Sequence, residues 1–342
     1  MKYDIDLSKV FIIAELSANH NQDIELAKKT IKAAKEAGAN AIKLQTLKPE
    51  WMTLNSNKKE FLANPNGPWR GTKLFDLYKK AYLPLDWHKE LFSYARSLDI
   101  EIFSSPFSTE AVDFLEEFDP VAYKIASFEI TDYELIRYAA KKQKTMIIST
   151  GIASIDEVQD VVDICKKEGN EKIILLKCTS SYPAPLKEAN LLTIPNMKET
   201  FGVEVGFSDH TIGISAPIVA VSLGARVVEK HFILDKSIPS LDRDFSLDKN
   251  EFALMVKSIR EAEELLGKVD YSLNEKKLNS RKSARSLYAI KDIKKGEVFT
   301  KKNIKAIRPG YGLHPKYLPK ILGKKARKDI DFATAISWDM VE

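Results

Sequence analysis

Eight short apolar runs alternate with longer segments of helical periodicity over roughly the first 270 residues, and this alternation limits the possible folds more than any other feature. Runs such as FIIAEL, MIIST and KIILLKC are almost continuously apolar, which is typical of parallel strands that are covered on both faces. We predict strands at residues 10–17, 41–46, 100–107, 122–129, 145–151, 172–182, 203–210 and 227–233. We predict helices at residues 24–37, 84–98, 109–118, 133–142, 155–168, 214–223 and 247–266, with Ser108 as the N-cap of the third.

Eight consecutive strand–helix units predict an α/β fold of the (β/α)8 TIM-barrel type, whose usual size is about 250 residues. A doubly wound sheet also alternates strands and helices, but it rarely needs eight units, and no GxGxxG motif follows the first strand. Beyond the barrel, a polar segment without apolar periodicity precedes short strand-like runs that are separated by turns. We therefore predict a barrel over residues 1–269, a linker over 270–284 and a small second domain over 285–342.

The two parts of the chain differ in charge. Residues 281–342 contain 16 Lys and Arg but 6 Asp and Glu, whereas the rest of the chain has 37 basic and 42 acidic residues. A basic segment can bind nucleic acid, a membrane surface or anionic small molecules. Because its basic residues are interleaved with Ile, Leu, Val and Phe, we expect a folded domain and no nucleic-acid partner.

Composition also favours a globular protein of the cytoplasm. No apolar run reaches the roughly 18 residues needed to cross a bilayer, and the start MKYDIDLSKV does not resemble a signal peptide, so we expect no membrane partner. The two cysteines, Cys165 and Cys178, supply neither a disulfide framework nor the spacing of zinc ligands. That cysteine usage fits a reducing compartment.

Polar side chains gather where the predicted strands end, and this is the face of a TIM barrel that carries the active site. Any one of them could be an ordinary buried polar residue, but burying so many charges together requires a partner. The set comprises Glu15, Lys43, Gln45, Ser105, Lys124, Ser127, Ser149, Ser180, Tyr182, Ser208, His210, Glu229 and His231.

Two groups within this set indicate the chemistry. His210 and His231 end neighbouring strands, so their imidazoles can converge on one divalent metal, for which Mn²⁺ is expected and Mg²⁺, Co²⁺ or Zn²⁺ is possible. Lys43 and Lys124, with the nearby serine hydroxyls, form a cationic lining suited to phosphate or carboxylate. Glu15 faces the same cavity and can act as a general base.

The remaining histidines receive no catalytic role. His20 is expected near the mouth of the barrel, His88 on a surface helix, and His314 in the small domain.

The motifs FIIAELSANH, AIKLQT, SSPFS, AYKIASFE, STGIAS, LLKCTSSYP, VGFSDHT and VEKHF resemble, in order and spacing, those of the bacterial sialic acid synthase family. The tail SARSLYAIKDIKKGEVFTKKNIKAIRPGYG is similar to that family's C-terminal antifreeze-like (SAF) domain. The resemblance covers essentially the whole chain. It implies the condensation of phosphoenolpyruvate with an open-chain amino-sugar aldehyde, with release of phosphate.

The resemblance also assigns roles to residues by motif. It implies His210 and His231 as metal ligands, and Glu15 as the acidic residue that activates water or the reacting groups. The residues implied to bind phosphoenolpyruvate are Lys43, Ser105, Lys124, Ser127, Ser149 and Ser208. The residues implied to contact the sugar are Gln45, Tyr182, Asp242 and Arg308, the last reaching into the partner's barrel in a domain-swapped homodimer.

Three departures from the N-acetylneuraminate-forming members lie near the sugar end. Ser180 stands where those enzymes carry Asn, AELS replaces AEIG, and the eighth loop reads SIPSLDRDFSL. They favour a 2,4-diacetamido-2,4,6-trideoxy hexose as the acceptor over N-acetylmannosamine, and a stereoisomer of that hexose, the precursor of legionaminic acid, is the alternative. Two other classes stay open at this stage: a Schiff-base aldolase that uses Lys43 or Lys124, and a carbohydrate- or anion-binding protein that uses the basic C-terminal domain.

Overall fold

The computed structural model describes residues 3–64 and 69–342. The chain divides into two compact units, Met1–Gly267 and Lys268–Glu342, and we describe each by itself.

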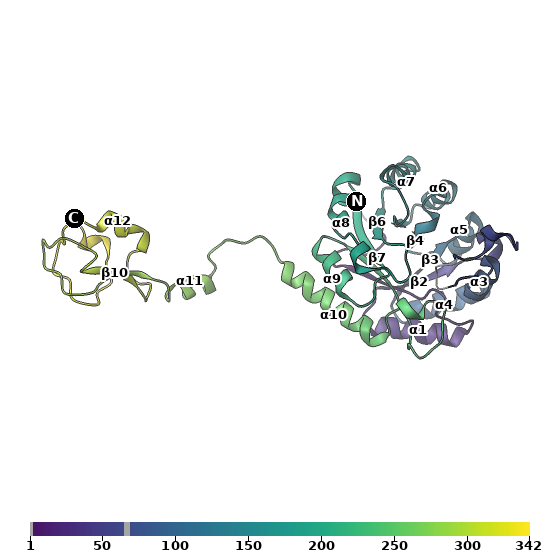
Figure 1. Ribbon diagram of the computed structural model, residues 1–342, viewed down its shortest axis with the longest axis horizontal. Coiled ribbons are helices and arrows are strands. Elements are labelled where there is room, and N and C mark those ends of the chain that lie inside the picture. The colour runs from purple at the N-terminus through teal and green to yellow at the C-terminus, as the bar shows by residue number, and fades with distance from the viewer. Residues whose placement is uncertain (1–2, 65–68) are drawn as a thin grey trace. The chain divides into compact units, whose positions relative to one another are not determined.

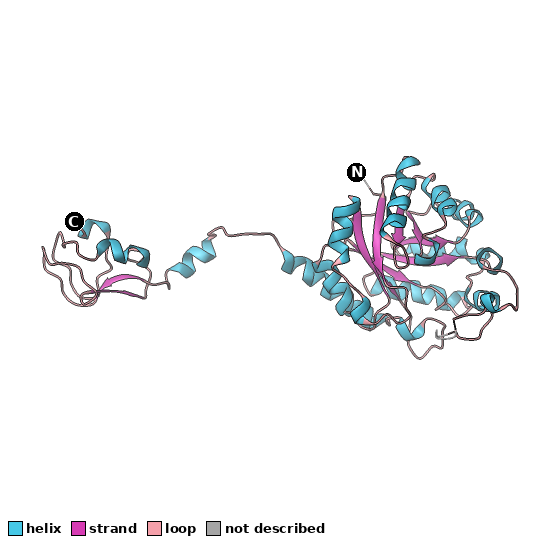
Figure 2. Cartoon of the chain, turned by 45° about the horizontal axis from the view of Figure 1, so that its top comes forward, coloured by secondary structure: helices cyan, strands magenta, loops and turns pink. Residues whose placement is uncertain are grey.

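The first unit is a closed barrel of eight parallel strands that neighbour one another in chain order (Figure 1). Its strands are β1 Phe11–Glu15, β2 Ala41–Thr46, β3 Glu101–Pro106, β4 Ala122–Ile125, β5 Thr145–Ser149, β6 Ile173–Cys178, β7 Glu204–Asp209 and β8 Val227–His231. The helices between them are α1 Ile24–Glu36, α2 Pro49–Met52, α3 Leu74–Ala81, α4 His88–Ser97, α5 Thr109–Glu116, α6 Tyr133–Ala140, α7 Ile155–Lys167, α8 Thr193–Phe201 and α9 Ser215–Ser222, and α10 Lys249–Leu266 follows the last strand. Figure 2 shows the helices around the strands, so the predicted TIM barrel is confirmed.

Strand alternation sorts the side chains of the barrel into two apolar cores. On β1, Ile12 and Ala14 pack outward with the surrounding helices, whereas Phe11 and Ile13 join a second cluster that fills the lumen with Phe103 and other residues. The next inward position on β1 is Glu15. The same period of two that builds an apolar plug at the N-terminal end of the lumen therefore places charged residues one layer above it.

Local capping sets where several helices begin. Ser108 accepts a hydrogen bond from the backbone N–H of Ala111, as predicted for the N-cap of α5. Asp248 and Glu251 form a capping box at the start of α10.

Helices α2, α3 and α8 were not predicted. The first two lie in the long connection between β2 and β3: α2 is only four residues long, and α3, although amphipathic, has a single buried residue, Leu77. Helix α8 carries a proline in its first turn, and it ends at Gly202, whose φ of 64° is the left-handed conformation that favours glycine.

The prediction that His88 lies on a surface helix is wrong. Its imidazole is fully buried at the start of α4, with Nε2 2.8 Å from the Thr46 hydroxyl and its ring centroid 5.1 Å from that of Phe114. Burial lowers the pKa of His88 to about 4, so the ring is neutral at pH 7. The sequence DWHKE looks polar, but only one face of the helix meets solvent. His20 is likewise buried, with its ring edge-on to Trp87.

The second unit has its own small core, formed by residues such as Leu287, Phe299 and Ile336. Its strands β9 Ser286–Ala289 and β10 Ile304–Ile307 pair antiparallel, and α12 Leu318–Ile321 follows. Helix α11 Glu275–Arg281 falls within the segment expected to be a linker. All its residues are exposed, which explains why hydrophobic periodicity did not predict it. In the described part of the chain, no helix is both long and apolar enough to cross a membrane.

A buried ion pair joins β7 to β8, and each of its members directly precedes a histidine, His210 or His231. Asp209 and Lys230 are register partners, with Lys230 Nζ 2.5 Å from Asp209 Oδ2, and neither side chain is exposed. Lys230 also donates a hydrogen bond to the carbonyl of Thr211. The pair therefore fixes the backbone on both sides of residue 210.

Replacement of Lys230 by Met should destabilise the protein strongly, because it leaves the Asp209 carboxylate buried without its cation. The expected loss of unfolding free energy is roughly 3–5 kcal/mol, measured by urea denaturation followed by circular dichroism. Lys257→Met is the matched control, since Lys257 forms an exposed pair with Glu261 at 3.8 Å and should leave the midpoint almost unchanged. Equal midpoints for the two variants would contradict this assignment.

Candidate active site

Four buried charged side chains of alternating sign cross the lumen above the apolar plug. Lys43 Nζ lies 2.6 Å from Glu15 Oε2 and 3.3 Å from Glu229 Oε2. Glu229 Oε1 in turn lies 3.7 Å from Lys124 Nζ. These residues come from β1, β2, β8 and β4, so closure of the barrel is what brings them together. We call Glu15, Lys43, Glu229 and Lys124 the charge chain.

Burial sets the protonation of the charge chain. Desolvation lowers the pKa of Lys43 to about 8, although the charge of Glu229 opposes that effect. Burial pushes the pKa of Glu229 upward, but the ammonium groups of Lys124 and Lys43 more than offset it, so the net pKa is lowered. At pH 7 Lys43 therefore presents positive charge to the lumen, and it shares the Glu229 carboxylate with Lys124.

Serine hydroxyls complete the lining. Lys43 Nζ lies 3.4 Å from Ser105 Oγ, and Lys124 Nζ donates to Ser149 Oγ at 2.7 Å. Ser208 Oγ donates to Glu229 Oε1 at 3.0 Å. Ser127 follows β4, and its Oγ accepts a hydrogen bond from the backbone N–H of Gly151 at 3.0 Å. The structure thus places the residues predicted to bind phosphoenolpyruvate around the same end of the barrel.

The two predicted metal ligands are neighbours at the ends of β7 and β8. The ring centroids of His210 and His231 are 5.4 Å apart. Tyr182 lies against the first, with centroids 4.3 Å apart, and Phe245 lies against the second at 4.9 Å. Burial lowers the pKa of His231 well below its usual value, and the positive charge of His210 adds to this effect.

The histidine pair fits a divalent metal with two protein ligands. His210 Nδ1 lies 3.1 Å from the carbonyl oxygen of Thr179, so its Nε2 is left for a metal, and His231 Nδ1 is buried without a hydrogen-bond partner in the described part of the protein. No group of three or more His, Cys, Asp or Glu positioned to hold a metal occurs among the described residues. The protein therefore offers two nitrogen donors, and the remaining positions would be open to water or substrate oxygen.

Two of the residues predicted to contact the sugar, Gln45 and Asp242, are joined to Glu15 by hydrogen bonds. Gln45 Nε2 donates to Glu15 Oε1 at 3.1 Å and to Ser17 Oγ at 3.2 Å. Ser17 donates in turn to Asp242 Oδ2, which also accepts from the backbone N–H of Ala18 at 3.3 Å. Burial raises the pKa of Asp242, and the hydrogen bond from Ser17 opposes that shift.

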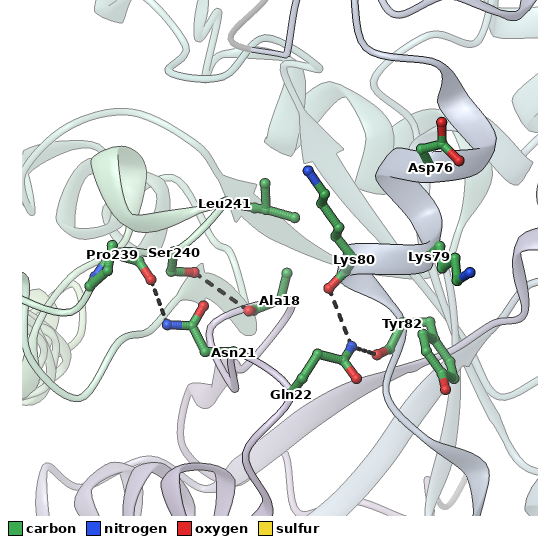
Figure 3. Close-up of a pocket in the computed structure, with 10 residues that line it drawn as sticks. All are labelled: Ala18, Asn21, Gln22, Asp76, Lys79, Lys80, Tyr82, Pro239, Ser240 and Leu241. Carbon is green, nitrogen blue, oxygen red and sulfur yellow. Dashed lines mark hydrogen bonds between the residues drawn. The ribbon is translucent and has the colours of Figure 1, made fainter.

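A pocket of about 990 Å³ opens next to this contact, between the loop after β1, helix α3 and the loop after β8 (Figure 3). Ala18 and Leu241, which neighbour Ser17 and Asp242 in the chain, line it. Asn21 Nδ2 donates to the carbonyl of Pro239 at 2.5 Å, and Gln22 Nε2 donates to that of Lys80 at 3.2 Å. The first loop thus connects both neighbouring walls of the pocket.

Three residues of the site were assigned no specific contact from the sequence, although Glu229 was among the strand-end candidates and Ser17 belongs to the AELS motif near the sugar end. Glu229 bridges the two lysines, and its place two positions before His231 on an alternating strand was the available signal. Ser17 joins Gln45 to Asp242, which no spacing indicates because the partners are far apart in sequence. Cys178 Sγ lies 3.7 Å from His210 Nδ1, and this contact also depends on barrel closure.

Arg308 belongs to the second unit, where it directly follows β10 and is exposed. Ser180 lies in the loop after β6, with its Oγ buried and without a hydrogen-bond partner in the described part of the chain.

Comparison with known proteins relates this chain to one family of enzymes. The model of the NeuB family matches residues 30–271, and that of the SAF domain matches residues 284–342. The chain is 54% identical to the pseudaminic acid synthase of Campylobacter jejuni (strain 81-176) over 96% of this chain and 95% of the relative. It is 50% identical to the pseudaminic acid synthase of Helicobacter pylori over 97% of each chain. A solved structure of the N-acetylneuraminic acid synthetase of Leptospira borgpetersenii in complex with citrate matches with a TM-score of 0.72 and 31% identity, covering 80% of this chain and 90% of that one.

The charge chain predicts how anion affinity depends on pH. Sulfate keeps its charge between pH 7 and 9, so its binding should weaken about tenfold over that range as Lys43 loses its proton above a pKa of about 8. Lys43→Arg should remove this weakening, because the guanidinium stays charged, and Lys43→Met should bind weakly at both pH values. Isothermal titration calorimetry of the three proteins measures the effect, and equal wild-type affinity at pH 7 and 9 would contradict it.

Proposed function

This chain belongs to the NeuB family, and on that premise we propose that it synthesises pseudaminic acid. The reaction joins phosphoenolpyruvate, the open-chain aldehyde of 2,4-diacetamido-2,4,6-trideoxy-L-altrose and water, and it releases phosphate. The single observation that carries the proposal is the charge chain with its serine hydroxyls beside the histidine pair, in a chain at least half identical to two pseudaminic acid synthases.

Phosphoenolpyruvate is the anion that suits the deep end of the site. Its phosphate and carboxylate would take the ammonium groups of Lys43 and Lys124 and the hydroxyls around them. Because these donors are already held by the barrel, they orient the enol carbon C3 without further reorganisation.

The acceptor would lie one layer above, between the histidine pair and Gln45. A divalent metal held by His210 and His231, for which we propose Mn²⁺, would polarise the aldehyde oxygen as a Lewis acid. Tyr182 packs on His210 and so forms the wall against which the sugar chain rests. Asp242 and Gln45 would accept and donate hydrogen bonds to its hydroxyl and acetamido groups.

The proposed reaction forms one carbon–carbon bond and breaks one carbon–oxygen bond. C3 of phosphoenolpyruvate forms a bond to the aldehyde carbon, whose oxygen becomes an alkoxide while positive charge develops at C2. Water adds at C2 and loses a proton, which Glu15 would accept and return to the alkoxide. The bond from C2 to the phosphate oxygen then breaks, and the proton of the C2 hydroxyl leaves with the phosphate, which gives the 2-keto acid and inorganic phosphate. Glu15 Oε2 lies 2.6 Å from Lys43 Nζ, and this ion pair holds the carboxylate in place for that role.

A homodimer in which each second domain serves the partner's barrel is part of the proposal. Large apolar side chains are exposed in the loops that follow four consecutive strands, β4 to β7, on the same end of the barrel as the site. They are Phe128, Ile152, Leu186 and Ile212, exposed by 58%, 46%, 63% and 67%. Such a rim favours a covering partner, and the exposed Arg308 would bring a fixed positive charge to the site. Two free cysteines accord with a cytoplasmic enzyme.

The assay that tests the proposal is phosphate release from phosphoenolpyruvate in the presence of a panel of 2-acetamido and 2,4-diacetamido hexoses. We expect release to require the L-altrose compound and Mn²⁺, to stop with EDTA, and to give a product of the mass of pseudaminic acid. Preference for the stereoisomer that leads to legionaminic acid would replace the proposed acceptor. A product from pyruvate without phosphate release would indicate an aldolase. His210→Ala should keep its circular dichroism spectrum but lose bound Mn²⁺.

The swapped dimer predicts complementation between two inactive variants. Arg308→Ala and Glu15→Ala should each lose most activity, since each lacks one component of every site. A verified heterodimer of the two should regain a fraction of the wild-type rate, because one of its sites combines an intact barrel with an intact Arg308. Failure to recover in heterodimers shown to be mixed by mass spectrometry would contradict the exchange.

A further inference from the structure

Ser17 lies at an uncommon point of the backbone. It follows β1 with a φ of 47°, in the left-handed region that non-glycine residues rarely adopt. A glycine would occupy this position without steric cost, so a side chain here needs a compensating contact.

The Ser17 hydroxyl makes two hydrogen bonds, and each goes to a residue proposed to contact the acceptor. It accepts from Gln45 Nε2 at 3.2 Å and donates to Asp242 Oδ2. The Gln45 amide also donates to Glu15 Oε1 at 3.1 Å. Glu15, Gln45, Ser17 and Asp242 thus form one directional row, which ends beside the pocket lined by Ala18 and Leu241.

The row is not needed to hold the two loops together. Asn19 already joins the loop after β1 to the end of β8, since its Nδ2 donates to the carbonyl of Phe232 and to Ser246 Oγ, each at 2.9 Å. Ser246 Oγ also donates to the carbonyl oxygen of Asp242 at 2.6 Å, which fixes the backbone of that residue. The bond from Ser17 therefore adds to the orientation of the Asp242 carboxylate, which otherwise accepts a longer hydrogen bond, of 3.3 Å, from the backbone N–H of Ala18.

From this geometry we infer that Ser17 is a positioning residue for the acceptor sugar: its hydroxyl fixes the Gln45 amide and the Asp242 carboxylate in the orientation that receives the sugar's hydroxyl and acetamido groups. The inference rests on the proposed function. It adds a residue that acts on acceptor affinity without touching the anion end of the site, where the lysines bond to other serines.

Ser17→Ala and Ser17→Gly test the inference as a pair. Both remove the hydroxyl, but only glycine relaxes the left-handed backbone, so Ser17→Gly should melt at or above the temperature of Ser17→Ala. Both should raise KM for the acceptor about tenfold, the effect of losing one hydrogen bond to a charged group, while KM for phosphoenolpyruvate stays within twofold of wild type. Ser97→Ala is the control for loss of a serine hydroxyl, since Ser97 ends α4 at the opposite end of the barrel and, among the described residues, donates only to the Tyr94 carbonyl.

Asn19→Ala supplies the contrast for a purely structural role and should lower the melting temperature. The inference is overturned if acceptor KM is unchanged in both Ser17 variants, if it rises only in the variant that melts lower, or if KM for phosphoenolpyruvate rises equally. If the wild-type enzyme releases no phosphate with any sugar, the proposed function is wrong. If the wild type is active and the Ser17 variants keep its KM for the acceptor, only the inference about Ser17 is wrong.

Discussion

The charge chain is the interaction on which the rest of this site depends. Two buried ammonium groups could not remain charged in an apolar lumen without carboxylates close by, and Glu229 lies between them while Glu15 pairs with the first. Each member comes from a different strand, so the alternating signs exist only when the barrel has closed in the right register. Closure of the barrel in this register therefore both pairs the buried charges and assembles the charged site.

Much of the fold was predictable because two periods govern it. Strand and helix periodicity identified all eight strands, and several predicted strands extended past the observed ends into the loops that carry site residues, as at Tyr182 and His210. Helices α2, α3 and α8 were not predicted, because α2 is only four residues long, α3 buries a single residue, and α8 carries a proline in its first turn.

The site was predictable at its strand ends and not in its loops. Alternation places Lys43, Lys124, Glu229 and His231 in the lumen, so residue type and strand position suffice to nominate them. The contact of Ser17 with Asp242 joins positions 225 residues apart, and nothing local to either residue encodes it. The prediction that His88 is exposed was wrong because its neighbours in sequence are polar, whereas its neighbours in space are Thr46 and three phenylalanines.

The apolar plug determines the end of the barrel at which molecules can enter and leave the site. Because Phe11, Ile13, Phe103 and their neighbours fill the lumen at the N-terminal end, the lumen opens at its other end, where the loops lie. The lysines lie one layer deeper than Gln45 and His231, which follow Lys43 and Glu229 by two residues on the same strands. A molecule bound at the lysines must therefore arrive before the one that rests above it, and it can leave only afterwards. In the proposed reaction, this closed end of the barrel would favour entry of phosphoenolpyruvate before the acceptor and release of phosphate after the sugar product.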